Sequence, residues 1–325
     1  KEQPMNKIQK YLLAILVLQF ILILAVFLLQ RPVIASNNLI FPDLKVESVT
    51  AINISDSAGN LVSLKKQGEQ WILPLQDDFP VNTEAIPQLV EKLATIRDNR
   101  LVTRSEASHD RLKISNENFE RKVEITIDGN EEIIYFGSSP ATSQMDFRLN
   151  GKPEVYLTNA LTSAQISTSI SSWVDTVIYQ ISSGSVKKIE ITNNAGDFKF
   201  KPGADTVWSG QPLEEGYQFD QSKWSSLLSG FTTLRFVEPV SKSKKTEYGF
   251  ETPQAIMNIE YSTESNPSMS GRLIIGSQDG SGNYYVTWSE SDYIYLIPSY
   301  NAERFVNLTA DDYSSSIATE ESENE

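Results

Sequence analysis

The sequence predicts an α+β protein: one N-terminal transmembrane helix, then two homologous domains, each an antiparallel or mixed sheet with one packed helix. Three observations lead to this prediction. The segment from Ser48 to Trp71 recurs from Ser185 to Trp208 at a constant offset of 137 positions. An apolar helical face follows each copy. A long apolar run precedes both copies.

The composition of the chain excludes several classes of function. The chain has 325 residues, 40% of them hydrophobic, which is enough for two domains with cores of their own. A net charge of −14 argues against nucleic acid, which requires a basic surface. The absence of cysteine excludes disulfides, thiolate metal sites and a cysteine nucleophile, and His109 is the single histidine. We therefore expect no metal and no cofactor.

The apolar run covers residues 11–30 and is broken only by Gln19. As a helix, its 19 residues from Tyr11 to Leu29 rise about 28 Å, close to the thickness of a bilayer core. Lysines in residues 1–10 place the N-terminus in the cytoplasm and the bulk of the chain outside it. We expect a single-pass cell-membrane protein with residues 11–30 in contact with lipid. The alternative is a cleaved signal peptide, with residues 33–35 as the cleavage site.

Gln19 lies near the middle of this run. A primary amide has two donors and an acceptor that lipid cannot satisfy. Such groups tend to contact another helix, so we expect Gln19 to touch a helix of a different subunit, unless lipid simply tolerates the amide.

After a linker at residues 31–43, the first domain spans residues 44–170. Alternating apolar residues predict strands, and Thr83 is expected to cap a helix. The strands are expected at 46–54, 61–65, 71–73, 122–127, 132–136, 145–150 and 154–157, and the apolar face of the helix is Ile86, Leu89, Val90, Leu93 and Ile96.

The second domain, residues 171–313, follows the same plan. Its helix face lies 138 positions further on, at Leu227, Leu228, Phe231 and Leu234. Trp71 and Trp208 are expected to be buried at equivalent sites between sheet and helix. Residues 314–325 are polar and acidic, which predicts a disordered tail.

Several motifs occur in a characteristic order: Trp71-Ile72-Leu73-Pro74, Tyr248-Gly249-Phe250-Glu251-Thr252-Pro253, Tyr284-Tyr285-Val286 and Ile294-Tyr295-Leu296-Ile297. With these motifs the chain resembles the bacterial envelope family labelled domain of unknown function 4340. The first copy departs from the pattern, because Asp110-Arg111-Leu112 stands where the second has Tyr248-Gly249-Phe250. Members are often encoded beside ABC-transporter permeases and gliding-motility-type auxiliary subunits. The resemblance therefore implies an accessory envelope component and supplies no catalytic residues.

No residue pattern indicates catalysis. The sequence has no nucleophile elbow and no phosphate-binding glycine loop, and a lone histidine in a charged loop is expected to be solvated. The Gly-rich segment from Asp279 to Asn283 is interpreted as a hairpin turn, because it lacks the bidentate glutamate of a calcium loop.

Aromatic residues gather near the end of the second copy. An aromatic row on a strand forms either a core ladder or a surface for a partner or ligand. The candidates for such a surface are Tyr284, Tyr285, Trp288, Tyr293 and Tyr295.

These observations predict a non-enzymatic, membrane-anchored extracytoplasmic accessory subunit of a membrane protein complex, most plausibly of an ABC-type transporter. Other membrane protein subunits would be its partners. The alternative is an extracytoplasmic ligand-binding module that uses the aromatic strands of the second copy to bind glycan or peptide.

Overall fold

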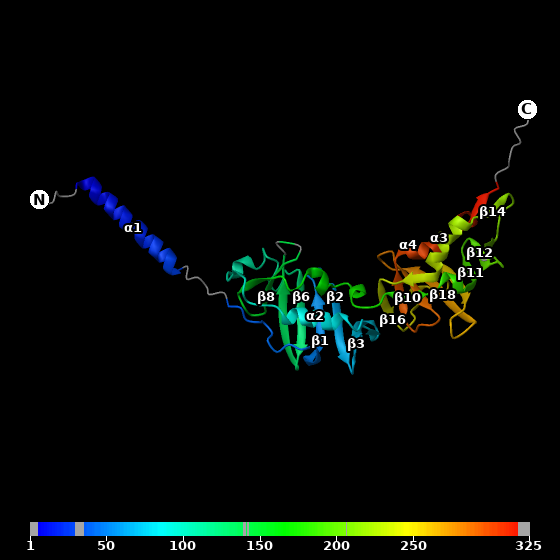
Figure 1. Ribbon diagram of the computed structural model, residues 1–325, viewed down its shortest axis with the longest axis horizontal. Helices are drawn as coiled ribbons and strands as arrows, with labels where there is room; N and C mark the ends of the chain where they lie inside the picture. Colours follow the sequence, from blue (N-terminus) through cyan, green and yellow to red (C-terminus); the bar gives the residue numbers. More distant parts are fainter. Residues whose placement is uncertain (1–5, 30–35, 139–140, 142, 206, 318–325) are drawn as a thin grey trace, which may run out of the picture.

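The computed structural model describes residues 6–29, 36–138, 141, 143–205 and 207–317, and it is built mainly from β-strands (Figure 1). Two large antiparallel sheets, one of nine and one of eight strands, lie side by side along the chain. The predicted α+β class is therefore wrong, because the described residues form mostly β-strands and only four helices. Short segments such as Leu101–Thr103 and Glu238–Ser241 join the sheets as edge strands, and their length gave no periodic signal.

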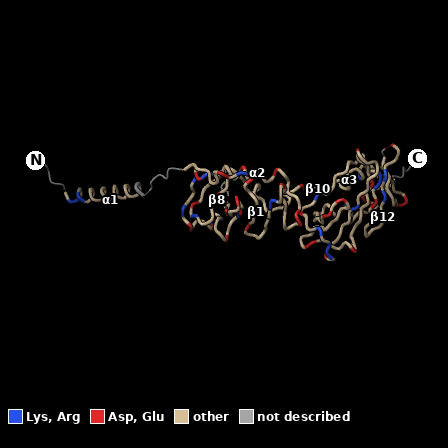
Figure 2. The backbone as a smooth tube through the Cα atoms, turned by 90° about the horizontal axis from the view of Figure 1, so that it is seen from below, with Lys and Arg blue, Asp and Glu red and all other residues tan. Residues whose placement is uncertain are grey.

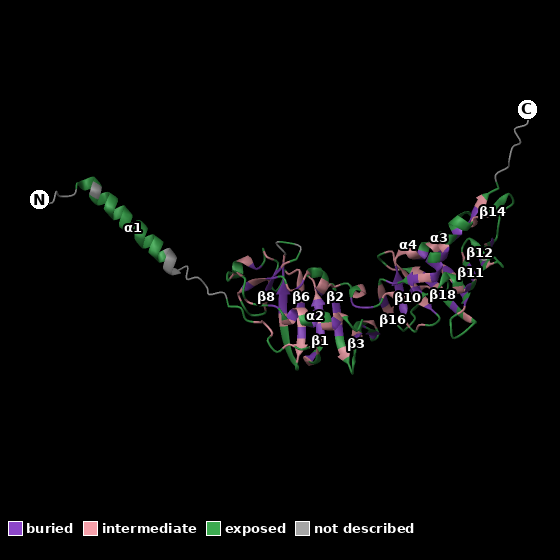
Figure 3. Ribbon diagram, in the orientation of Figure 1, coloured by how far each residue is buried: buried purple, intermediate pink, exposed green. Residues whose placement is uncertain are grey.

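The first helix, α1 (Lys7–Leu29), covers the apolar run. Its described residues are exposed (Figure 3), and its large apolar side chains, where described, are between 47% and 72% exposed. Within the described part of the chain, no helix combines the length and the apolar character that crossing a membrane requires. This finding contradicts the predicted transmembrane helix at residues 11–30 and the lipid contact expected of it.

The first sheet has the strand order β4-β3-β2-β1-β6-β7-β8-β9-β5, with every neighbouring pair antiparallel. Buried residues alternate with half-buried or exposed ones along its central strands, so one face is core and the other faces solvent. The strands are β1 (Val49–Ser55), β2 (Leu61–Gln67), β3 (Gln70–Leu73), β4 (Phe79–Pro80), β5 (Leu101–Thr103), β6 (Arg121–Ile127), β7 (Asn130–Phe136), β8 (Met145–Leu149) and β9 (Val155–Thr158).

The second sheet has the order β13-β12-β11-β17-β18-β19-β20-β16. Two further pairs flank it, β10 with β15 and β14 with β21. The strands are β10 (Val177–Gln180), β11 (Val186–Asn193), β12 (Gly196–Pro202), β13 (Trp208–Gln211), β14 (Tyr217–Phe219), β15 (Thr233–Arg235), β16 (Glu238–Ser241), β17 (Ala255–Tyr261), β18 (Met269–Gln278), β19 (Tyr284–Trp288), β20 (Ile294–Ile297) and β21 (Ser314–Ser316).

Apart from β4, the two sheets have the same strand order. Strands β3-β2-β1-β6-β7-β8-β9-β5 correspond one by one to β13-β12-β11-β17-β18-β19-β20-β16. The correspondence extends further toward the N-terminus than expected, because Leu39 bridges Arg97 as Val177 pairs with Arg235. The segment at 39–40 therefore bonds with residues 96–97 after α2, although it was interpreted as linker.

The turn that differed between the copies in sequence has the same backbone shape in both. Lys113 (φ 53°) donates its N–H to Asp110 O, and Gly249 (φ 73°) donates to Thr246 O in the same way. The sequence comparison was thus out of register by two residues, and Lys113 takes the left-handed position that glycine fills in the second copy. Each turn packs against a glycine, Gly137 or Gly276, on which a Cβ would clash with turn carbonyls.

One helix covers each sheet, α2 (Ala85–Ala94) in the first half and α3 (Gln221–Thr232) in the second. The expected apolar face of α2 is buried. Thr83 does not cap it, because the N-cap position is Glu84 and no side chain accepts from the first turn; Asn82 Oδ1 accepts from Glu84 N at 3.0 Å just before the helix. The second half also has a helix that the sequence did not indicate, α4 (Ser299–Val306).

Trp71 and Trp208 lie on the equivalent edge strands β3 and β13, but both are half-buried, so the expectation of full burial is wrong. The fully buried tryptophan is Trp224 of α3, which stacks on Phe200 at 4.2 Å. The predicted tail also begins later than expected, since Ser314–Ser316 forms β21. Residues 318–325 lie outside the described residues.

Candidate functional site

The five aromatic residues singled out from the sequence do not form one exposed row. Trp288 and Tyr295 are buried, and Tyr284, Tyr285 and Tyr293 are half-buried. Trp288 stacks on Tyr179 at 4.3 Å, and Tyr285 packs on Tyr248 at 4.3 Å. Most of the surface of these rings is therefore in contact with other side chains of the same chain.

Tyr293 and Tyr295 contribute instead to a junction between the two halves. Phe79 of β4 inserts among three rings of the second half, with centroid distances of 4.7 Å to Tyr293, 5.5 Å to Phe236 and 6.2 Å to Tyr295. Phe79 is 7% exposed. Aromatic pairs at such distances add to the energy of burial.

Polar contacts surround this aromatic cluster. The carboxylate of Asp77 accepts from Ser241 Oγ at 2.8 Å and from Lys242 N at 2.7 Å. These hydrogen bonds hold the pKa of Asp77 below its ordinary value. Tyr293 Oη donates to the carbonyls of Asp77 and Asp78 at 3.3 and 3.2 Å, and Lys242 Nζ lies 4.6 Å from the Tyr293 ring centre.

The loop that makes these contacts is backbone-strained. It follows a short 3₁₀ turn, η2 (Pro74–Gln76), and both Asp77 and Asp78 have positive φ, 52° and 60°. Aspartate tolerates this region better than most residues, yet two in succession carry a cost. The junction contacts stabilise this loop, so we interpret it as a fixed joint between the two sheets.

A second polar cluster surrounds the buried Arg148 of β8. Its guanidinium donates to Ile114 O at 2.8 Å and to Asn116 Oδ1 at 2.7 Å, and lies 4.5 Å from the Tyr135 ring centre. Burial lowers the pKa of Arg148. His109 is buried rather than solvated, because its Nε2 donates to Pro153 O at 3.0 Å. These bonds fix the 109–120 loop to the sheet, which accounts for both residues without a ligand.

Basic side chains gather on strand β12 and its neighbours (Figure 2). Lys188 pairs with Glu190 at 3.0 Å and Glu260 at 3.7 Å, and Lys199 lies 3.9 Å from Glu190. Exposed ion pairs of this kind contribute little to stability, and here they set carboxylates beside the lysines.

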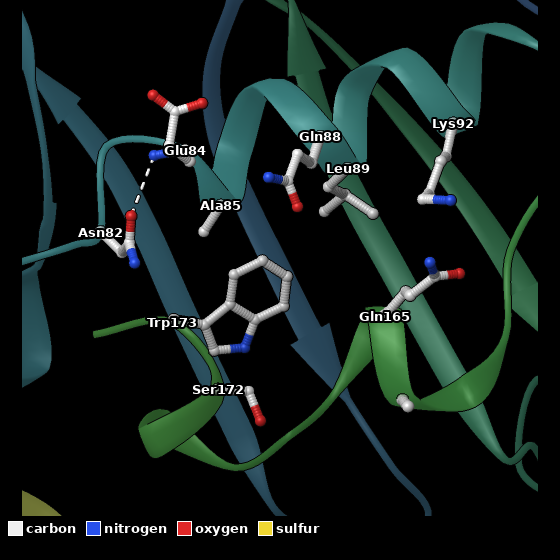
Figure 4. A pocket seen from close by; sticks show the side chains of 10 residues that line it. Asn82, Glu84, Ala85, Gln88, Leu89, Lys92, Gln165, Ser172 and Trp173 are labelled. Carbon is white, nitrogen blue, oxygen red and sulfur yellow. Dashed lines mark hydrogen bonds between the residues drawn. The ribbon is translucent and has the colours of Figure 1, made fainter. Parts of the chain in front are cut away.

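A groove of about 220 Å³ lies beside helix α2 (Figure 4). The helix forms one wall, and the segment from Ala164 to Trp173 forms the other. Trp173 lies at the base and is 3% exposed. The remaining lining is mostly polar and consists of Asn82, Glu84, Ala85, Gln88, Leu89, Lys92, Gln165 and Ser172.

Two of the amides that line this groove have a fixed orientation. Asn82 Oδ1 accepts from Glu84 N, and Gln165 Oε1 accepts from Thr162 N at 2.9 Å. Since their oxygens are engaged by the backbone, their NH₂ groups remain as donors toward the groove. Lys92 adds a cationic donor at one end, and Glu84 lies at the other end with its carboxylate directed away from Trp173 (Figure 4).

Among the described residues, no group of three or more histidine, cysteine, aspartate or glutamate side chains could hold a metal ion. Gln19 lies on α1 with an exposed side chain. The sequence did not indicate the junction, because Asp77 and Ser241 are 164 positions apart. It did not indicate the groove either, because Trp173 is far from α2 in the sequence.

The fold and these sites define a two-sheet protein with a fixed junction. Residues 71–253 match the family described as Domain of unknown function (DUF4340), and the chain belongs to that family. The matched residues include Asp77, Phe79, Phe236, Ser241 and Lys242 of the junction, whereas Tyr293 and Tyr295 lie beyond the match. No curated protein and no solved structure matches the chain.

Proposed function

We propose that the protein is a non-enzymatic accessory subunit of a membrane protein complex in the cell envelope, most plausibly of an ABC-type transporter, with its two sheets on the extracytoplasmic side. The observation that carries the proposal is the junction. Phe79 and Asp77 fasten the sheets into one elongated body, and a rigid body can hold partner proteins at a set distance.

The exposed apolar helix α1 supports a subunit role. Its described apolar side chains have no cover within the chain, and exposed apolar surfaces of this kind mark sites of association. We propose that partner subunits cover α1 and that Gln19 hydrogen-bonds with one of them.

The other proposal from the sequence, a ligand module built on aromatic strands, has less support. Trp288 and Tyr295 lack the exposed ring faces that stacking on a sugar would need.

The experiment is purification of the tagged full-length chain in mild detergent, with mass spectrometry of what accompanies it. The proposal expects transporter permease or other membrane subunits in stoichiometric amounts. A chain that runs alone in several detergents, at native expression, would refute it. Protease added to spheroplasts tests the location of the sheets, which should be digested while the membrane is intact.

A further inference from the structure

The groove beside α2 presents hydrogen-bond donors that have no acceptor within the described part of the chain. Lys92 is half-buried, and its Nζ makes no hydrogen bond or ion pair with another described residue. The side-chain oxygens of Asn82 and Gln165 accept from backbone N–H groups, which leaves both NH₂ groups without a described partner. The groove therefore offers an ammonium group and two amide groups to an occupant.

Lys92 and Gln165 extend toward each other from opposite walls of the groove (Figure 4). An ammonium group is only a donor, and the free part of the Gln165 amide is its NH₂ group, so these two side chains cannot satisfy each other. An acceptor placed between them can bond with both. A carboxylate suits this position best, because it accepts through two oxygens and brings the negative charge that Lys92 lacks beside it.

No carboxylate of the groove lining takes this place. Glu84 is the one acidic residue among the described lining, and it lies at the other end with its carboxylate directed away from Trp173 (Figure 4). By contrast, Lys122 of β6 has a carboxylate of the chain beside it, since its Nζ lies 2.9 Å from Glu124 Oε1. Within the described residues, the charge of Lys92 therefore remains uncompensated.

We propose that this groove binds an extended, acidic segment of a partner protein, with a carboxylate of that segment between Lys92 and Gln165 and its backbone running along α2 toward Asn82. This inference rests on the proposed function in taking the occupant to be a partner protein.

The length of the groove suits a short extended segment. From Ala85 to Lys92 the helix rises about 10 Å, which is the length of about three extended residues. Ala85 and Leu89 line the groove between its polar ends. The NH₂ group of Asn82, just before the helix, can donate to a backbone carbonyl of the segment.

The properties of the groove argue against other occupants. Its volume of about 220 Å³ is below the usual range for whole cofactors or drug-sized ligands, roughly 300–1,000 Å³. A sugar would need an open aromatic face to stack on, and Trp173 is only 3% exposed. A basic segment would be repelled by Lys92. The net charge of −14 opposes an anion at long range, but salt screens charges beyond about 8–10 Å, so the contact with Lys92 decides.

Lys92 also lies in the last turn of α2, where a cation interacts favourably with the helix dipole. That interaction stabilises the helix whether or not the groove is occupied. The test therefore measures binding, and thermal unfolding of the same variants measures the contribution to stability separately.

The test uses the indole N–H signals of the ¹⁵N-labelled full-length chain, which has five tryptophans. Trp173→Phe identifies the signal of Trp173, whose Nε1 donates to Ser167 O at 2.9 Å. The probe is acetyl-Ala-Glu-Ala-amide, titrated to millimolar concentration, and it is compared with the same peptide carrying glutamine or lysine at its centre. We expect a saturable shift of the Trp173 signal with the glutamate peptide and at least about fivefold weaker binding of the other two.

Two variants of Lys92 and one control sharpen the test. Lys92→Gln removes the charge and keeps a donor, so the glutamate peptide should bind at least about fivefold more weakly. Lys92→Arg keeps the charge and should retain the affinity of the wild type. The matched control is Lys65→Gln, which removes the same charge from an exposed position of β2 and should bind as the wild type does.

Equal affinity of the glutamate and glutamine peptides would overturn the inference. So would the absence of a saturable shift with the glutamate peptide, unchanged affinity in Lys92→Gln, or tighter binding of the lysine peptide. Acetate that saturates the Trp173 shift at the same concentration as the glutamate peptide would assign the groove to free carboxylic acids and overturn the peptide occupant. These outcomes leave the proposed function standing if membrane subunits still co-purify with the wild-type chain. Absence of such subunits refutes the proposed function, whatever the peptides do.

Discussion

The carboxylate of Asp77 in the first half accepts hydrogen bonds from Ser241 and from the backbone of Lys242 in the second half, at 2.8 and 2.7 Å. This one side chain connects two sheets that are otherwise separate in their strand pairing. Its backbone has a positive φ of 52°. The contact between the two sheets therefore includes Asp77, although the sequence around Asp77 does not predict this contact.

Replacing Asp77 by alanine should loosen the junction without unfolding either sheet, because both acceptor bonds are lost while the cores are untouched. Amide hydrogen exchange at Lys242 checks this directly, since the Lys242 N–H is one of the two donors. Exchange should be faster in Asp77→Ala. Asp77→Asn, which keeps one acceptor oxygen and tolerates a positive φ, should be intermediate. Unchanged protection in Asp77→Ala would remove Asp77 from the account of the junction.

The same contacts predict a dependence on pH. Hydrogen bonds to Lys242 and Ser241 lower the pKa of Asp77 from its ordinary value of 3.8. A lowered carboxyl pKa means that its contribution is complete above 3.8 and is lost as the pH falls through the lower, folded value. The Lys242 amide shift, followed by NMR, should titrate below pH 3.8 in the wild type and show no such step in Asp77→Ala. A step above that pH would contradict the assignment.

Trp224 should matter more than either repeated tryptophan. Trp224→Ala removes a side chain that is 1% exposed and should lower the free energy of unfolding by about 3–5 kcal/mol. Trp224→Phe should cost less than Trp224→Ala, because it keeps one aromatic ring and because Trp224 Nε1 has no hydrogen-bond partner to lose among the described residues. Denaturant unfolding measures both. A loss in Trp224→Phe as large as that in Trp224→Ala would contradict this reasoning.

The residue at the left-handed position of each turn should affect stability. Lys113→Gly relieves a strain of about 1–2 kcal/mol, which the added freedom of the unfolded chain offsets by about 0.4–1 kcal/mol, so a small gain in stability is expected. Gly249→Ala should destabilise, by about 1–3 kcal/mol, because its φ is 73° and a Cβ would lie 2.8 Å from Ser277 N. Thermal unfolding of the two variants provides the comparison, and stabilisation by Gly249→Ala would contradict it.

Gln19 tests the role of α1. Gln19→Leu removes the amide and keeps the apolar character of the helix, so partner subunits should be recovered in smaller amounts at matched expression. Gln67→Leu, at an exposed position of β2, controls for loss of an amide elsewhere. Recovery equal to the wild type in several detergents would exclude Gln19 from the interface and leave the two sheets as the site of attachment.

Much of each sheet could be predicted from the sequence, because strand alternation and the constant offset from Val49 to Val186 are local signals. The strand ends agree within a few residues, and the burial of Leu89 and Phe231 follows from helical periodicity. The transmembrane helix was inferred from the length and apolar character of the run and from the lysines before it, and the described part of α1 does not meet the requirement.

The junction and the groove could not be predicted, for a physical reason. Phe79 is one apolar residue in a polar loop, and its partners Phe236 and Tyr293 lie in the other half of the chain. The groove lies between α2 and the segment from Ala164 to Trp173, and these two parts are far apart in the sequence.

The central claim is that the two sheets form one rigid body, and an inter-sheet distance distribution tests it most directly. The chain has no cysteine, so Thr50→Cys on β1 and Ser270→Cys on β18 place one spin label on each sheet without interference. Double electron–electron resonance should give a single narrow distance for this pair, and Asp77→Ala in the same background should broaden it. A broad distribution in the chain with Asp77 intact would contradict the account.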